Sequence, residues 1–262
     1  MSLISTLTSG VSALRSFSTG LQTIGNDIAN VTTTSYKKGH VSFADTFAGV
    51  GVQATGVTTS FTQGSLENTG NVTDLGVSGN GFFIVKDSSG NQFATRDGSF
   101  HYDSTGKLVT SQGFALQGLV GGSVADLALG TPPAGTQLKS MSIDTAGNIT
   151  EFYSDGTSAV TGQVLLQNFN NTAALTKQGN NLYGALDLAG PVGGSVFGTP
   201  ANNAPNSNGL GAIQSGTLEQ SNVDLTEEFS NMITMQRSFQ AGSRLITVSD
   251  SVLEDIVNLK QR

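Results

Sequence analysis

The sequence contains no cysteine, no tryptophan and only two histidines among 262 residues. Without cysteine the chain can form no disulfide, no thiolate metal site and no cysteine nucleophile. This absence is typical of a protein in a reducing compartment, or of one that is exported unfolded and must not cross-link. His40 and His101 are isolated in the sequence, with no acidic motif nearby, so we expect no metal site and no cofactor.

Charged residues are also scarce, at 12 %, and hydrophobic residues make up only 37 %, against about 25 % and 45–50 % in ordinary globular proteins. The net charge is −7, and no basic face is visible, which argues against non-specific nucleic-acid binding. No apolar run approaches the roughly 18 residues of a membrane-spanning helix, so we expect no membrane insertion. The N-terminal stretch has no basic segment before its apolar residues, so we also expect no cleaved signal peptide.

Motifs that would carry catalysis are missing as well. Asp97, Asp103 and Asp144 stand beside Gly or Ser or near them, a context typical of turns. The Gly-Asn-Gly of residues 79–81 precedes a strand-like segment, so no helix N-terminus is available to hold a phosphate. The acidic turn at residues 87–91 is too short for a helix–loop–helix calcium site. We therefore expect that the protein is not an enzyme.

Glycine, in contrast, is abundant: 34 of 262 residues, about 13 % against a usual ~7 %. Between residues 72 and 164 turn signals such as Asp97-Gly98 recur every eight to twelve residues, a pattern that favours an antiparallel sheet, barrel or sandwich. Residues 186–216 are rich in Gly, Asn, Ala and Pro and are expected to be a loop. Residues 31–70 are Gly- and Thr-rich and predict an extended arm or linker.

Two heptad patterns frame this glycine-rich centre. In each, apolar residues recur every seven positions, which predicts one amphipathic helix at each end of the chain. Asp224 is placed to cap the second helix, with Glu227 as its reciprocal partner. The members are Leu7, Leu14, Leu21 and Ile28 in the first, and Leu225, Met232, Phe239, Ile246 and Leu253 in the second.

The predicted fold is therefore α+β. Residues 1–30 and 221–262 form a discontinuous coiled-coil rod, residues 31–70 form the arm, and residues 71–220 form an inserted, mainly antiparallel β domain. The first helix is rich in Ser and Thr and carries three glycines, so we expect it to be only marginally stable without a partner surface.

The five apolar residues of the second heptad series contribute on the order of 10 kcal/mol when buried. Two helices alone bury only part of this surface, so copies of the same chain are the expected partners, and head-to-tail contacts between copies generate filaments. Two alternatives are an ordinary surface helix packed on its own domain and an antiparallel helical hairpin in a monomer. The expected assembly interface consists of Leu7, Val11, Leu14, Leu21, Ile28, Leu225, Phe229, Met232, Phe239, Ile246 and Leu253.

Several motifs resemble those of the axial proteins of the bacterial flagellar rod and hook. They lie at residues 24–37, 79–83, 95–110, 179–183 and 218–237, with Asp27 where the family usually has Asn and Ser35 where it has Gly. The matching residues are Asn26, Ile28, Ala29, Asn30, Tyr36, Lys37, Gly81, Phe82, Phe83, Arg96, Asp97, Gly98, Ser221, Asn222 and Val223.

The resemblance implies an inner coiled-coil layer, an outer β domain and export through the hollow flagellar axis. Residues 42–49 and 61–64 resemble hook proteins, and the short stretch between Leu119 and Val164 leaves little room for the outer domain that many hook proteins add. A short hook subunit, acting as a flexible coupling for torque, fits both facts; the distal rod is the alternative. A secreted adhesin that forms a discrete oligomer is the alternative from another class.

The partners that the resemblance implies are copies of the chain itself, neighbouring rod and hook-junction proteins, the cap protein and the flagellar export apparatus. The implied location is the hook and basal body of the flagellum, outside the cell after export.

Overall fold

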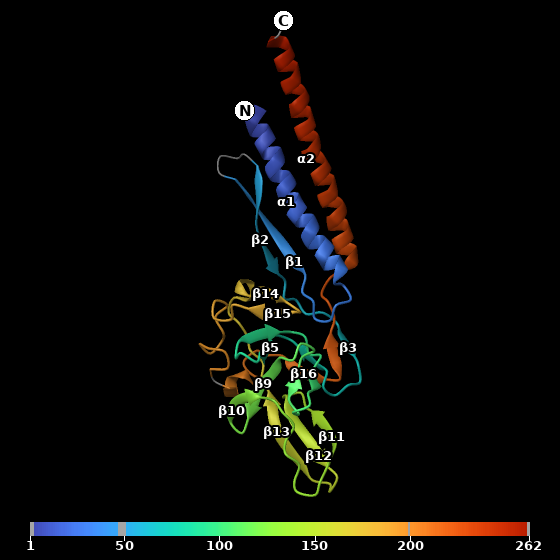
Figure 1. Ribbon diagram of the computed structural model, residues 1–262, viewed down its shortest axis with the longest axis vertical. Coiled ribbons are helices and arrows are strands. Elements are labelled where there is room, and N and C mark those ends of the chain that lie inside the picture. The colour runs from blue at the N-terminus through green and yellow to red at the C-terminus, as the bar shows by residue number, and fades with distance from the viewer. Residues whose placement is uncertain (1–2, 47–50, 199, 261–262) are drawn as a thin grey trace. The chain divides into compact units, whose positions relative to one another are not determined.

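The computed structural model describes residues 3–46, 51–198 and 200–260 (Figure 1). The chain divides into two units. One combines Met1–Thr32, Lys37–Phe61 and Val223–Arg262, and the other combines Thr33–Tyr36 with Thr62–Asn222. We call them the helical unit and the β unit. Both are discontinuous in sequence, because the chain crosses between them four times.

In its described residues, the helical unit contains two long helices and one β-hairpin. Its elements are α1 (Leu3–Ala29), β1 (Gly39–Asp45), β2 (Val52–Thr59) and α2 (Leu225–Lys260). The helices run side by side in opposite directions, and α2 extends beyond α1 at its C-terminal end (Figure 1). At 1.5 Å per residue, α1 is about 40 Å long and α2 about 54 Å.

Side-chain hydrogen bonds mark the start of α2 and the end of α1. Asp224 Oδ1 accepts hydrogen bonds from the backbone N–H groups of Thr226 (2.8 Å) and Glu227 (3.2 Å), so the predicted cap of α2 is confirmed. At the end of α1, Asn30 Nδ2 donates to the carbonyl oxygen of Asn26 at 2.8 Å. Neither helix within the described residues has a stretch long and apolar enough to cross a membrane.

Residues 39–59, for which the sequence predicted an extended arm, form the antiparallel β1–β2 hairpin. The hairpin lies along α1 (Figure 1). The predicted motif at residues 42–49 falls partly in β1, and its residues 47–49 lie outside the described part of the chain.

The β unit is built from short antiparallel strands. Among the described residues, eleven of these strands form one sheet, with the order β11-β12-β13-β9-β5-β6-β15-β14 along its path; β10 and β8 also pair with β9, and β7 pairs with β8. The strands are β3 (Leu66–Asn68), β4 (Leu75–Ser78), β5 (Phe83–Lys86), β6 (Gln92–Thr95), β7 (His101–Tyr102), β8 (Leu108–Val109), β9 (Ala115–Val120), β10 (Ser123–Asp126), β11 (Leu138–Ile143), β12 (Asn148–Tyr153), β13 (Ser158–Val164), β14 (Thr176–Gly179), β15 (Leu182–Gly184), β16 (Ala212–Ser215) and β17 (Thr217–Glu219).

The first and last strands of this unit pair with each other: β4 with β16 and β3 with β17. Two short 3-10 helices, η2 (Thr172–Ala174) and η3 (Pro200–Asn203), lie in the later connections. The predicted loop at residues 186–216 therefore contains η3 and β16. One apolar core holds the unit together, and its largest members include Leu75, Phe83, Phe100, Leu116, Leu166 and Ile213.

The observed fold is thus mainly antiparallel β structure with one long helix near each end of the chain. This confirms the predicted α+β class and its antiparallel β domain.

Candidate assembly interface

Several contacts between α1 and α2 place a glycine of one helix close to a larger side chain of the other. A Cβ atom added to Gly10 would lie 3.1 Å from Ile246 Cγ1 and 3.7 Å from the carbonyl oxygen of Gly242. A Cβ atom on Gly20 would lie 3.4 Å from the sulfur of Met235. Glycine destabilises a helix interior by about 1 kcal/mol relative to alanine. At these positions, however, the lack of a side chain lets the two helices approach closely. Gly25, in contrast, has no atom within 4 Å of such a Cβ.

The β1–β2 hairpin covers another face of α1. Ser16 Oγ donates a hydrogen bond to the carbonyl oxygen of Val52 at 2.9 Å, and the N–H of Val52 donates to Ser12 Oγ at 3.3 Å. At the other end of the hairpin, the N–H of Gly39 donates to both carboxylate oxygens of Asp27, at 3.0 and 3.1 Å. The polar face of α1 is therefore a docking surface for the hairpin within the same unit.

Two of the expected interface residues, Leu14 and Ile246, take part in the contact between α1 and α2. None of the eleven is fully buried. The residues that α1 does bury are others: Gly10, Ser16, Gly20, Thr23, Ile24 and Asp27. The half-buried members of the expected interface are Leu7, Leu14, Leu21, Ile28, Met232 and Ile246, and its exposed members are Val11, Leu225, Phe229, Phe239 and Leu253.

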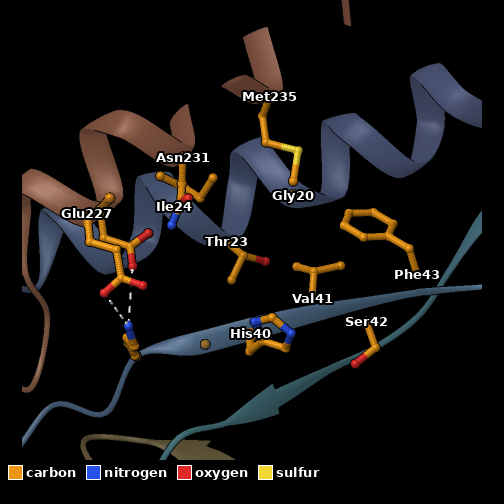
Figure 2. Close-up of a pocket in the computed structure, with 13 residues that line it drawn as sticks. Gly20, Thr23, Ile24, His40, Val41, Ser42, Phe43, Glu227, Asn231 and Met235 are labelled. Carbon is orange, nitrogen blue, oxygen red and sulfur yellow. Dashed lines mark hydrogen bonds and ion pairs between the residues drawn. The ribbon is translucent and has the colours of Figure 1, made fainter. Parts of the chain in front are cut away.

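A cavity of about 490 Å³ lies between α1, β1 and the first turns of α2 (Figure 2). Thr23 and Ile24 of α1, the side chains of β1 around Val41, and Met235 of α2 line it. Lys38 closes one end, where its Nζ donates to Glu227 Oε2 at 2.9 Å and lies 4.0 Å from Glu228 Oε1.

The charges around this cavity are coupled. The hydrogen bond to Glu227 raises the pKa of Lys38, against the opposing effect of burial. Burial raises the pKa of the Glu228 carboxyl group, and the neighbouring Asp27 raises it further, while Lys38 lowers it. Asp27 therefore places a second carboxylate near that of Glu228.

The motif residues of the β unit converge on a buried ion pair. Arg96 Nη1 lies 3.7 Å from Glu219 Oε2, and the guanidinium carbon of Arg96 lies 5.2 Å from the centre of the Phe82 ring. Burial lowers the pKa of Arg96 and raises the pKa of the nearby Tyr183 phenol. Arg96 Nε and Nη1 have no hydrogen-bond partner among the residues that the structure describes.

Ser35 joins separate segments at this ion pair. Its N–H donates to the carbonyl oxygen of Glu219 at 2.7 Å, and its Oγ donates to the carbonyl oxygen of Arg96 at 2.8 Å. Glu219 Oε1 accepts the N–H of Gly64 at 2.8 Å. The segments around Ser35, Gly64 and Glu219 are thereby held together at one point of the β unit. Each of these segments is close in sequence to a boundary with the helical unit.

The remaining motif residues have structural positions. Phe82 and Phe83 are buried in the β unit, and Gly98 packs so closely that an added Cβ would meet the carbonyl oxygen of Leu75. Asn222 Nδ2 donates to Thr62 Oγ1 at 2.8 Å. Lys37 is fully buried in the helical unit. Asn26 and Ala29 are exposed on α1, and Asn30, Tyr36, Asp97, Ser221 and Val223 are partly buried, while Gly81 is buried.

No catalytic arrangement is evident in these contacts. Within the described residues there is no group of three or more His, Asp or Glu side chains placed to hold a metal ion. The pronounced feature is instead a pair of long helices whose apolar positions are incompletely covered. Such a unit is suited to packing against other chains.

Comparison with known proteins identifies this type of unit. Residues 214–259 match the C-terminal family of flagellar basal body rod FlgEFG proteins, and residues 76–151 match the D1 domain family of flagellar hook protein FlgE/F/G. The chain is 34 % identical to the flagellar basal-body rod protein FlgG of Bacillus subtilis (strain 168), over 99 % of this chain and 100 % of the relative. It is 30 % identical to FlgG of Borreliella burgdorferi, over 92 % of this chain and 93 % of the relative. It is 25 % identical to the flagellar hook protein FlgE of Salmonella typhimurium, over 95 % of this chain and 98 % of the relative.

The chain belongs to the family of flagellar basal-body rod and hook proteins. Like the other members of this family, it is a structural protein of the flagellum, of its basal body or its hook, and not an enzyme.

Proposed function

We propose that the protein polymerises through its two terminal helices into a tubular segment of the flagellar axis, with the helices forming an inner coiled-coil layer. The observation that carries this proposal is the exposure of apolar residues of the expected interface: Leu225, Phe229 and Leu253 remain exposed although α1 and α2 already pack together. Burying a large apolar side chain contributes about 1.5–3 kcal/mol. Contacts between copies supply the burial that one chain lacks.

Of the two segments, we infer the distal rod. Two relatives named basal-body rod proteins align with the chain over nearly the full length of both partners, in 280 and 264 aligned positions. The hook relative needs 405 aligned positions to cover 95 % of this chain, which indicates a long additional segment in that protein. A rod subunit of this kind serves a stiff shaft that transmits torque.

The hook is the second candidate. It is favoured by the resemblance of residues 42–49 and 61–64 to hook proteins. In that case the tube acts as a flexible coupling. In either case the neighbours are other axial proteins of the rod and hook junction and the cap protein. The chain reaches them through the flagellar export apparatus, a route that the lack of cysteine permits.

Electron microscopy of the purified full-length protein, concentrated until it assembles, tests the proposal. Straight tubes support the distal rod, and curved or supercoiled tubes support the hook. A discrete ring or small oligomer instead supports the adhesin alternative. A protein that stays monomeric at all concentrations contradicts polymerisation.

A further inference from the structure

Helix α2 carries a second apolar stripe that does not face α1. Leu225, Phe229 and Ile233 follow one another at intervals of four residues, so they lie on one side of the first three turns. Their side chains are 40, 50 and 54 % exposed. The residues of α2 that meet α1, Gly242 and Ile246, lie about 120° around the helix from the centre of this row. We call these three residues the α2 stripe.

Further along α2 lies a groove of about 570 Å³ that is formed by this helix alone. Its lining residues have the spacing i, i+3, i+4, i+7, i+8, i+11, which describes two adjoining holes of four residues each. A knob from a facing helix fills such a hole in coiled coils. The groove is lined by Arg237, Gln240, Ala241, Arg244, Leu245 and Val248.

The groove is also uncovered. Leu245 and Val248 are 52 and 61 % exposed, and Ala241 at the boundary between the two holes is exposed as well. Because the side chain of Ala241 is short, the groove is deepest there, and the longer side chains of Arg237 and Arg244 form its rim. A large apolar knob is therefore the kind of side chain that this groove fits.

We propose that the α2 stripe of one copy docks into the α2 groove of a second copy. This inference rests on the proposed self-assembly and specifies which surfaces meet. Two knobs four residues apart, Phe229 and Ile233, match two holes whose equivalent corners, Arg237 and Ala241, are also four residues apart. With both helices pointing the same way, Phe229 enters the first hole and Ile233 the second.

Charge favours this pairing over a symmetric one. Residues 224–233 contain Asp224, Glu227 and Glu228 and no basic residue, whereas residues 236–248 contain Arg237 and Arg244 and no acidic residue. Stripe against stripe, or groove against groove, would bring like charges together. An arginine rim also gives the ring of Phe229 a cation–π partner.

The pairing has a geometric consequence. Phe229 sits about eleven to twelve residues before the centre of the first hole, so neighbouring copies are staggered by about 17 Å along the helix axis. The two surfaces are different patches on the same chain, which makes the contact heterologous and non-closing. Each docked copy still offers a free stripe at one side and a free groove at the other, as continued growth requires.

Cysteine cross-linking tests the contact, since the natural chain contains no cysteine. One preparation carries Ile233→Cys and another carries Ala241→Cys, both in the full-length chain. The two are mixed, assembled and oxidised mildly. We expect a disulfide-linked dimer in the mixture and none in either preparation alone. The matched control replaces Ala241→Cys with Thr247→Cys, an exposed position on a different side of α2, and should give no dimer.

A second measurement does not depend on disulfide geometry. Phe229→Ala should raise the concentration needed for polymerisation about tenfold, as removal of an interface anchor does, and Arg237→Glu with Arg244→Glu should do the same. Tubes that form normally in all these variants, with no cross-link between positions 233 and 241, overturn the docking while leaving the proposed function intact. A natural chain that forms no tubes defeats the proposed function itself.

Discussion

Gly10 of α1 and Gly242 of α2 oppose each other where the two helices cross, so that a Cβ atom on Gly10 would lie 3.7 Å from the carbonyl oxygen of Gly242. Heptad leucines alone do not describe this packing. Glycines of one helix face larger side chains of the other, as Gly10 faces Ile246 and Gly242 faces Leu14, and other large apolar residues of the pair are left exposed. This division leaves apolar surface of the helical unit uncovered, which is the surface through which we propose that copies assemble.

The first prediction concerns this crossing. Gly10→Val adds a branched side chain where Ile246 Cγ1 is already 3.1 Å from an added Cβ, so the helices must separate. We expect a loss of about 1–3 kcal/mol, as for overpacked cores, measured by thermal unfolding of the helical circular dichroism signal. Both long helices belong to the helical unit, so this signal reports on that unit.

Gly25→Ala is the matched control for Gly10→Val. It lies in the same helix, and no atom lies within 4 Å of its added Cβ. Alanine has the higher helix propensity, so this variant should be more stable than the natural protein by up to about 1 kcal/mol. Equal behaviour of the two variants would speak against close packing at Gly10.

The second prediction concerns the buried ion pair of the β unit. Arg96→Met leaves the Glu219 carboxylate buried without its arginine and should cost about 3–5 kcal/mol of unfolding free energy. The double variant Arg96→Met/Glu219→Gln should cost less than Arg96→Met alone. All four tyrosines lie in the β unit, so urea unfolding followed by tyrosine circular dichroism measures it. A double variant as unstable as the sum of both single ones would refute the coupling.

The third prediction concerns Ser35, whose φ of 57° is left-handed. Ser35→Ala keeps this strained backbone and removes the Oγ hydrogen bond to Arg96, at a cost of about 1–2 kcal/mol. Ser35→Gly removes the same bond but relieves the strain, which is worth about 1 kcal/mol or more. The glycine variant should therefore be the more stable of the two in the same tyrosine-monitored unfolding.

The fourth prediction concerns pH. Because the folded protein raises the pKa of Glu228, protonation of this group favours folding: its contribution is complete below the unfolded pKa of about 4.3 and is lost as pH rises through the folded value. Glu228→Gln should therefore raise the melting temperature of the helical unit at pH 7 and have little effect near pH 3.

Glu227→Gln is the control for the pH experiment. It weakens the 2.9 Å contact with Lys38 and should lower the melting temperature slightly at pH 7, since the contact is partly exposed. If Glu228→Gln instead destabilises the protein at pH 7, the balance of burial and attraction assigned to Glu228 is incorrect.

The sequence predicts the periodic elements of this fold well. The end of α1 near Asn30, the Asp224 cap and the antiparallel strands around Phe83 follow from local rules of spacing and capping. The β1–β2 hairpin could not be predicted in this way. What holds it against α1 is a set of hydrogen bonds between residues far apart in the sequence, such as that from Ser16 to Val52, and local patterns do not reveal these.

The candidate interface shows the same limit. Phe229 is among the expected interface residues, but the periodicity of apolar residues alone does not separate the side of α2 that meets α1 from the side that stays exposed. Ala241, Arg244 and Leu245 were not among the expected interface residues. Their spacing of three and four was readable in the sequence, but their exposure was not.

The most direct test of self-assembly is sedimentation velocity of the natural chain and of two truncated chains, one without residues 1–30 and one without residues 221–262, over a range of concentrations. The account predicts that the natural chain forms polymers above a threshold concentration and that both truncated chains stay monomeric. Polymers from a truncated chain, or a natural chain that sediments as a single monomer with both ends fully ordered, would contradict it.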